Sequence, residues 1–259
     1  MASYGVASLT VAVIAGLSCG FLNTVASSGS AVSLPILMWI GLHAVDANAT
    51  NRIPVLVGGI AATVHLARRH KIPWKMALRA AVPVTVGAGC GALLAEVIPS
   101  HDLRIFITGA VVAALVLVLT KLKNAVNAAT AGEPRFRWQE ALWFLVIGLW
   151  LGFIVLDGAT YVLLALVLAV RLPLVEANAI KSFLLVPTTA VAMLIFADHG
   201  SIDWKLGSVM GLGSVAGGLL GARLAVSDHA RRWIVELLVV VIVGELIQLS
   251  IRYFLHLIG

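Results

Sequence analysis

Charged residues are scarce in this sequence. Asp, Glu, Lys and Arg make up 12% of the 259 residues, whereas 61% are hydrophobic. A chain of this composition has too few polar side chains to cover a water-soluble globule of its size. We therefore expect an integral membrane protein whose helices lie in a lipid bilayer.

Signatures of disulfides, metals and cofactors are also lacking. The two cysteines, Cys19 and Cys90, lie in apolar runs without partner spacing, which predicts neither a disulfide nor a metal site. The seven histidines show no spacing of the kind that holds haem, and the glycines follow no strand that would form a phosphate-binding loop. We expect no cofactor and no enzyme activity.

The first apolar run lacks the Lys/Arg region of a signal peptide, so we interpret it as the first membrane segment. The net charge of +6 does not indicate a nucleic-acid partner, because the basic residues cluster in short loops between apolar segments. Such loops are typical of the cytoplasmic face of a membrane protein.

Apolar runs recur along the chain and predict an all-α polytopic fold. Most are long enough to cross a bilayer at about 20 residues per helix. The runs 31–42 and 159–170 are too short. The runs lie at 8–22, 31–42, 49–67, 80–98, 103–120, 141–156, 159–170, 179–196, 206–222 and 233–251.

The two halves of the chain are similar to each other. Residues 42–95 align with 172–225 without a gap, and 15 of the 54 pairs are identical. VDANATNR in the first half answers VEANAIKS in the second, and IPWK answers IDWK. We therefore expect one membrane domain, 1–259, built from repeat one (1–121), a cytoplasmic linker (122–138) and repeat two (139–259).

Corresponding loops differ in charge, which indicates that the repeats are inverted. RRHK at 68–71 aligns with DHGS at 198–201. If each repeat crosses an odd number of times, 14 of the 18 Lys and Arg residues fall on one side, whereas an even number gives 11 and 7. The positive-inside rule favours the first arrangement, with both termini periplasmic.

An odd number of crossings requires the first helix of each repeat to be broken or re-entrant. Residues 8–42 as one straight helix would rise about 52 Å, far more than a hydrocarbon core of about 30 Å. The polar stretch TVASSGS at 24–30 is the expected break, and LDGATY at 156–161 is its counterpart. Paired broken helices indicate a transporter's substrate site.

The sequence resembles the TauE/SafE family of membrane permeases from about residue 8 to 250. The resemblance is carried by GFLNTVASSGSAVSLPILMWIGLHAVDANATNRI at 20–53, by the basic loop with IPWK, and by GFIVLDGAT and VEANAIKSF. It implies a secondary transporter, expected to export a small anion such as sulfite or a sulfoacetate-like sulfonate across the bacterial inner membrane. Ser-Ser-Gly-Ser stands where many relatives have a Gly-rich run.

Other functions stay open at this point. An uptake permease for a carboxylate or another oxyanion would share these features, and a passive channel would share the repeats. A membrane-embedded enzyme subunit fits less well, because no convergent catalytic groups are visible. A homo-oligomer is neither predicted nor excluded by the sequence.

The expected substrate site consists of the two breaks and of polar positions on the helices that follow them. Helix starts offer free N–H groups and a positive dipole end to an anion. The expected site residues are Asn23, Ser27, Ser28, Gly29, Ser30, Asn48, Asn51, Arg52, Asp157, Gly158, Thr160, Asn178, Lys181 and Ser182.

Simpler roles compete with substrate binding at several of these positions. The serines and the pair Asn48 and Asn178 are also suitable helix N-caps. The cations Arg52 and Lys181 are near helix ends from which they could reach the interface.

Two residues are candidates for proton coupling. Asp157 is the only acid in the second break, where it could instead cap a helix or pair with a cation. His65 is the only histidine well inside an apolar run, where a hydrogen-bonded packing role is the alternative.

Overall fold

The structure is a computed structural model that describes residues 4–97, 134–156 and 158–227, together with the single positions 232, 234, 236, 237 and 240. This part of the chain consists of helices and their connections, without strands, as the sequence predicts. The expected segment 103–120 and most of the segment 233–251 lie outside the described residues, as does most of the expected linker.

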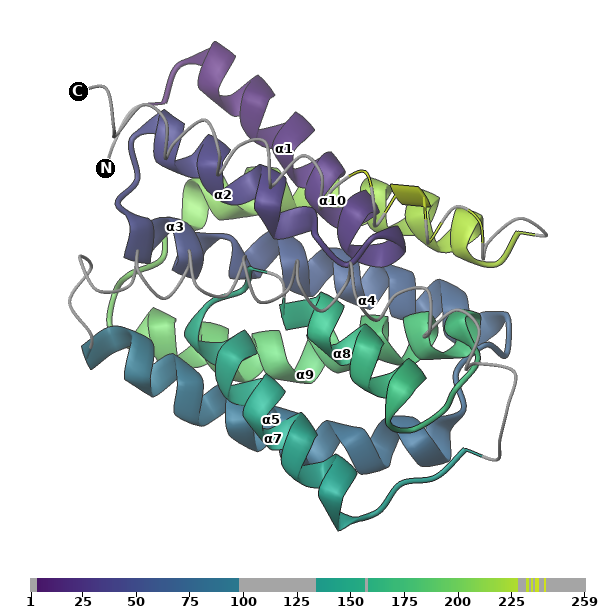
Figure 1. Cartoon of the computed structure of the whole chain (residues 1–259). Coiled ribbons are helices and arrows are strands. Elements are labelled where there is room, and N and C mark those ends of the chain that lie inside the picture. The colour runs from purple at the N-terminus through teal and green to yellow at the C-terminus, as the bar shows by residue number, and fades with distance from the viewer. Residues whose placement is uncertain are drawn as a thin grey trace, which may run out of the picture.

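The helices follow the same order in both halves (Figure 1). In the described residues, each half begins with a helix, continues after a break with a short helix, and then has two longer segments. The first half contains α1 (Val6–Val25), α2 (Gly29–Ile40), α3 (Ala44–Thr50), α4 (Arg52–Arg68) and α5 (Trp74–Val97). The second contains α7 (Trp138–Phe153), α8 (Gly158–Leu168), α9 (Leu174–Asp198) and α10 (Trp204–Ala225).

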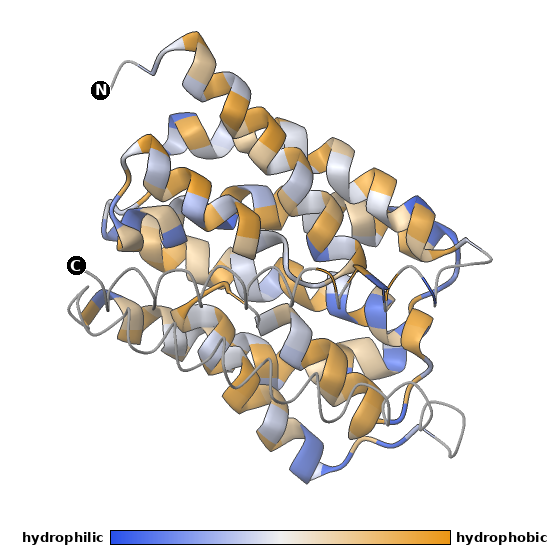
Figure 2. Cartoon of the chain, turned by 45° about the horizontal axis from the view of Figure 1, so that its top comes forward, coloured by the Kyte–Doolittle hydropathy of each residue, from blue (hydrophilic) through white to orange (hydrophobic). Residues whose placement is uncertain are grey.

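Four of these helices, α1, α5, α9 and α10, are long and apolar enough to cross a membrane. Their outward faces carry large apolar side chains. On α5, Leu78, Val82 and Val86 are more than half exposed, whereas Ala77 and Ala80 are buried. Figure 2 shows hydrophobic residues along the helices and hydrophilic residues mostly near their ends. The chain is therefore a multi-pass membrane protein, and along α5 the small side chains face inward whereas the large ones face outward, toward lipid.

The predicted first break is confirmed. Helix α1 ends at Val25 and α2 begins at Gly29, close to the expected run 31–42. Between them Ser27 has a φ of 62°, in the left-handed region that residues other than glycine rarely adopt. Helix α2 ends at Ile40 and is followed by Gly41, whose φ of 116° suits glycine and whose N–H donates to the carbonyl of Leu37.

The predicted second break is also confirmed. Helix α7 ends at Phe153, and Ile154 adopts an extended conformation. Helix α8 then begins at Gly158 and ends at Leu168, close to the expected run 159–170. Both halves therefore contain a short helix that starts after a polar interruption.

One difference between the halves has a local cause. The segment that forms α3 and α4 is interrupted at Asn51, whereas the aligned segment forms the continuous helix α9. Pro54 has no N–H to donate to the carbonyl of Thr50, and the aligned position in α9 is Leu184. The proline thus removes one helical hydrogen bond beside the interruption.

Helices from different halves approach closely through glycines. A Cβ on Gly16 or Gly20 of α1 would overlap the backbone carbonyl of Met210 or Ser214 of α10. Since both residue numbers increase together, α1 and α10 run in the same direction. Such small-residue contacts let helix backbones touch in a membrane protein.

The counterpart of this contact joins α7 to α5. A Cβ on Gly148 or Gly152 of α7 would overlap the carbonyl of Val84 or Ala88 of α5, so these two helices also run in the same direction. Each half thus packs its first helix against the last described helix of the other half.

The central helices α4 and α9 run in opposite directions. Arg52, at the start of α4, lies over the ring of Phe196 near the end of α9, with 5.3 Å from Cζ to the centroid. Further along α4, Gly59 lies beside Val186.

Two further contacts fix the directions of the outer helices. Ile53 and Gly58 of α4 lie beside Gly207 and Gly218 of α10, so these helices are parallel. Helices α5 and α9 are parallel as well, because Trp74 stacks edge-on against Phe183 and Gly89 lies beside Val191.

Candidate functional site

Asn23 stabilises the conformation of the first break. Its Oδ1 accepts a hydrogen bond from the N–H of Gly29 at 2.9 Å, and its Nδ2 lies 3.5 Å from Sγ of Cys19. Asn23 therefore satisfies the first free N–H of α2. Ser28, which occupies the N-cap position, makes no side-chain cap bond and donates instead to the carbonyl of Ala26. The interpretation of Ser28 as a cap is wrong.

Asn51 ties α2 to the start of α4. Its Nδ2 donates to Oγ of Ser30 at 3.1 Å, and its Oδ1 accepts from Oγ of Ser33 at 2.7 Å. All three side chains are at most 2% exposed. These bonds form because Ser30 and Ser33 are three residues apart, which places them on one face of α2.

The two breaks meet inside the molecule. Oγ of Ser28, directly before α2, lies 3.5 Å from Oγ1 of Thr160 in the first turn of α8. Both residues are at most 1% exposed. The starts of α2 and α8 therefore adjoin, and each helix start leaves N–H groups without intrahelical partners.

Lys181 binds the end of α1 from the other half. Its Nζ donates to the carbonyls of Asn23 at 2.6 Å and Thr24 at 3.1 Å, to Oγ of Ser27 at 3.2 Å and to Oδ1 of Asn178 at 2.8 Å. The side chain is fully buried. Carbonyls at a helix C-terminus carry partial negative charge, so they suit a buried ammonium group.

Arg52 binds the end of α7 in a similar way. Its two terminal nitrogens donate to the carbonyls of Leu151 at 2.6 Å and Gly152 at 2.8 Å. Arg52 is 1% exposed, and its Nε has no hydrogen-bond partner in the part of the chain that the structure describes. Each buried cation thus donates hydrogen bonds to the C-terminal end of the helix that precedes the break in the opposite half.

The two repeat-related asparagines support these contacts. Nδ2 of Asn178 donates to the carbonyl of Thr24 at 2.9 Å, and Nδ2 of Asn48 donates to the carbonyl of Phe153 at 3.2 Å. Oδ1 of Asn48 also accepts from the N–H of Val155 at 3.1 Å. Both asparagines lie inside helices and bond across the halves, so their interpretation as N-caps is wrong.

The cations do not reach the membrane interface. Arg52 and Lys181 are buried and held by carbonyls, so the alternative in which they extend to the surface is wrong. Across the described residues, their hydrogen-bond acceptors are backbone, amide and hydroxyl oxygens, and none is a carboxylate. Asp157, the expected acid of the second break, lies outside these residues.

Three further expected residues are Ser182, Gly158 and His65, of which Gly158 lies at the second break as expected. Ser182 donates to the carbonyl of Asn178 within its own helix. Gly158 starts α8, and its N–H donates to the carbonyl of Leu156. His65 follows Arg52 by 13 positions on α4, about 20 Å along the helix axis.

Sequence reasoning missed several contributors to this cluster. Ser33 is buried and donates to Oδ1 of Asn51, and the carbonyl of the buried Thr24 accepts from Asn178 and Lys181, although neither residue was among the expected site residues. The position of Ser33, three residues after Ser30, was the available signal. The sequence could not indicate that the carbonyls of Leu151 and Gly152 contact Arg52, because every residue type has a backbone carbonyl.

The resulting site is a buried polar cluster between the two breaks, with one cation on either side. Its groups can donate hydrogen bonds and supply positive charge at depth in a membrane protein, where both favour an anion. No group of three or more metal-binding side chains occurs among the described residues.

Comparisons with known proteins identify the family of the chain. The sequence profile of the family described as "Sulfite exporter TauE/SafE" matches residues 12–246. The "Probable membrane transporter protein ORF9" of Sinorhizobium sp. is 28% identical over 237 residues, covering 91% of this chain and 90% of that protein. The "Probable membrane transporter protein YfcA" of Escherichia coli K12 is 27% identical over 224 residues, covering 85% and 81%. No solved structure matches the chain.

Proposed function

Because the chain belongs to the TauE/SafE sulfite exporter family, we propose that this membrane transporter is a secondary exporter of a small anion. Sulfite and sulfoacetate-like organosulfonates are the proposed substrates, and the bacterial inner membrane is the proposed location. The observation that carries the proposal is the meeting of the two breaks, with Ser28 and Thr160 in contact between two buried cations.

The helix starts are the proposed contact points of the anion. The N–H of Gly29 is already bonded to Asn23, which leaves the N–H groups of Ser28 and Ser30 on one side and of Thr160 on the other as donors. Two helix dipoles point their positive ends at this place. Hydroxyls of Ser27, Ser28, Ser30 and Thr160 add donors that can rotate toward an oxyanion.

The proposed role of Arg52 and Lys181 is to supply positive charge. Charge that is not neutralised by a carboxylate raises the affinity of a low-dielectric site for an anion. In this conformation their N–H groups point at carbonyls, so their attraction acts over a longer distance than a direct hydrogen bond. Asn178 positions Lys181 by accepting from its Nζ. Asn48 bonds the end of α7, and Asn51 bonds Ser30 in the first turn of α2.

We further propose that the repeats are inverted and that substrate exchange follows alternating access. Helix directions support this. Helix α1 is parallel to α10 and therefore to α4, whereas α7 is parallel to α5 and therefore to α9. Since α4 and α9 are antiparallel, α1 and α7 run in opposite directions. Inverted repeats with a site at their interface are common in secondary transporters.

Counterflow in proteoliposomes tests the function. Vesicles loaded with unlabelled sulfite or sulfoacetate should accumulate the labelled anion from outside, whereas vesicles loaded with taurine or sulfate serve as a panel for selectivity. Saturable counterflow with lactate and none with sulfite or sulfoacetate would favour a carboxylate permease. Flux that does not saturate would favour a channel.

A titration of purified variants tests the buried cations. Arg52→Gln and Lys181→Gln should each weaken substrate binding about tenfold or more, because charge-assisted interactions contribute about 1.5–3 kcal/mol. Arg69→Gln, which removes an exposed arginine, is the matched control and should leave the affinity unchanged. Unchanged affinity in both test variants would remove the cations from the site.

A further inference from the structure

We propose that a cavity at the end of the molecule where α1 begins is the outer vestibule of the transport path. We also propose that Leu37, Leu206 and Met210 form a closed apolar gate between this cavity and the buried polar cluster. Both statements rest on the proposed function, because a gate is needed only if an anion reaches that cluster.

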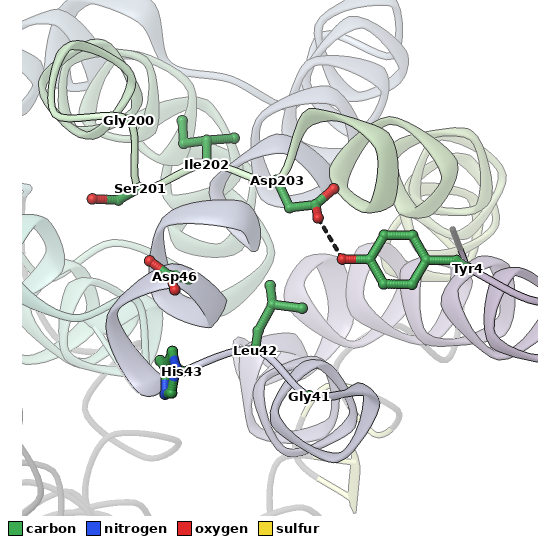
Figure 3. Close-up of a pocket in the computed structure, with 9 residues that line it drawn as sticks. All are labelled: Tyr4, Gly41, Leu42, His43, Asp46, Gly200, Ser201, Ile202 and Asp203. Carbon is green, nitrogen blue, oxygen red and sulfur yellow. Dashed lines mark hydrogen bonds between the residues drawn. The ribbon is translucent and has the colours of Figure 1, made fainter. Parts of the chain in front are cut away.

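The cavity opens between connections from both halves. It has a volume of about 340 Å³. Figure 3 shows Leu42, from the connection between α2 and α3, and Asp46, from the first turn of α3, facing Ile202 and Asp203, from the connection between α9 and α10. The remaining lining residues are Tyr4, Gly41, His43, Gly200 and Ser201. The volume is large enough for a hydrated small anion, and much of the lining is polar.

Asp203 joins the cavity wall to the interior. Its Oδ2 accepts from the hydroxyl of Tyr4 at 2.5 Å. Its Oδ1 accepts from the N–H of Leu206, so that Asp203 is the N-cap of α10. Burial and the bond to Asp203 raise the pKa of Tyr4 to about 12, so Tyr4 remains a neutral donor. The N–H of Asp203 donates to Oγ1 of Thr50, the residue directly before Asn51. One residue therefore separates this wall from the polar cluster.

An apolar layer lies between the cavity and the cluster. Tyr4 and Leu42 line the cavity and pack against a group of buried residues that includes Leu37, Leu206 and Met210. These three side chains are fully buried.

The same apolar group reaches the polar cluster on its other side. Cys19 belongs to it, and its Sγ lies 3.9 Å from Oδ1 of Asn51 and 3.5 Å from Nδ2 of Asn23. Val155 belongs to it as well, and its N–H is bonded to Asn48. The apolar group thus contacts both the cavity and the polar site.

A dry apolar layer stops an anion, because the ion would have to lose its hydration without new partners. Opening requires one side of the layer to move, and α2 is the element suited to do so. This short helix packs mainly against α1 and α3, and it is bounded by the left-handed residues Ser27 and Gly41. A tilt of α2 about these ends would carry Leu37 away from Met210, a motion of the hinge type.

The native thiol of Cys19 reports whether the gate is closed. Cys19 is fully buried on the side of the apolar group that contacts the polar cluster, whereas Cys90 is exposed and can be replaced in a Cys90→Ala background. In this background, an impermeant methanethiosulfonate added outside intact cells should react slowly with Cys19. Leu37→Ala and Met210→Ala should each raise the reaction rate about tenfold or more by favouring the open state.

Leu212→Ala is the matched control. Leu212 lies on the same helix as Met210 but is 75% exposed on the outward face, so its truncation should leave the rate unchanged. If Met210→Ala does not accumulate in the membrane, Met210→Val and Leu37→Val carry the same test with smaller cavities. Equal rates in the gate variants and in Leu212→Ala would overturn the gate, and faster labelling only from the cytoplasmic side would overturn the outer vestibule.

This labelling is independent of the substrate. Faster labelling without counterflow would support the gate and reject the proposed substrates. Counterflow without faster labelling would support the transporter and reject the gate.

Discussion

Asn23 shows how one side chain can stabilise a helix break at membrane depth. Its Oδ1 accepts from the first N–H of α2, and its own carbonyl accepts from Lys181. A buried N–H without a partner is costly, and no water is available inside the bilayer to replace the bond. The residue therefore serves the shape of the break before it serves any substrate.

Replacement of Asn23 by alanine should lower the free energy of unfolding by about 1–3 kcal/mol, because the N–H of Gly29 loses its acceptor in a buried site. Thermal unfolding of the purified protein in detergent measures this change. Thr10→Ala removes an exposed hydroxyl that donates to the carbonyl of Val6 in its own helix, and it should have little effect. Equal midpoints for the two variants would contradict this account of the break.

For single residues, the sequence predicted which side chains belong to the polar cluster, but it did not predict the groups that they contact. Arg52 and Lys181 were expected beside the breaks and are there, but their partners are carbonyls of the opposite half. Local spacing cannot reveal such partners, because any residue can present a carbonyl. Asn48 and Asn178 were read as caps for the same reason, since their neighbours in sequence do not show the helix end that they contact.

Among the helices, close contacts depend on the absence of side chains. Gly16 of α1 leaves no room for a Cβ beside the carbonyl of Met210 on α10. The same contact occurs between Gly148 of α7 and Val84 of α5. Because backbone atoms and not flexible side chains line these positions, the helices must separate to accommodate a methyl group.

Gly16→Ala should therefore destabilise the protein by about 1–3 kcal/mol, the usual cost of overpacking. Gly5→Ala is the matched control, since a Cβ on Gly5 would have no atom within 4 Å. Thermal unfolding in detergent compares the two variants. A midpoint for Gly16→Ala as high as that of Gly5→Ala would show that α1 and α10 do not pack as described.

Helix boundaries were predictable where a polar or glycine residue interrupts an apolar run. The breaks before Gly29 and Gly158 and the short helices that follow them agree with the sequence. The division of α3 from α4 at Asn51 was not expected, although Pro54 is visible in the sequence. Proline in the first turn of a helix is usually harmless, so its effect here depends on the bonds of Asn51 to α2.

In the whole molecule, the charged residues of the described part differ between the two ends of the helices. The connection from α4 to α5 contains Arg69 and Lys71, whereas the aligned connection from α9 to α10 contains His199 and Asp203. Because α4 and α9 are antiparallel, these two connections lie at opposite ends. From the positive-inside rule we propose that the first connection is cytoplasmic and the second periplasmic.

Single cysteines test this topology in a Cys90→Ala background. His70→Cys and His199→Cys place thiols at two exposed positions, one on each connection. An impermeant thiol reagent added to intact cells should label His199→Cys and spare His70→Cys, and permeabilisation should make both reactive. The bilayer prevents the reagent from reaching a cytoplasmic loop, so labelling depends on the side and not on the local structure. The reverse pattern would place the basic connection outside. Labelling of both variants in intact cells would place both connections on the same side, which would contradict the opposite directions of α4 and α9 and therefore the inverted repeats.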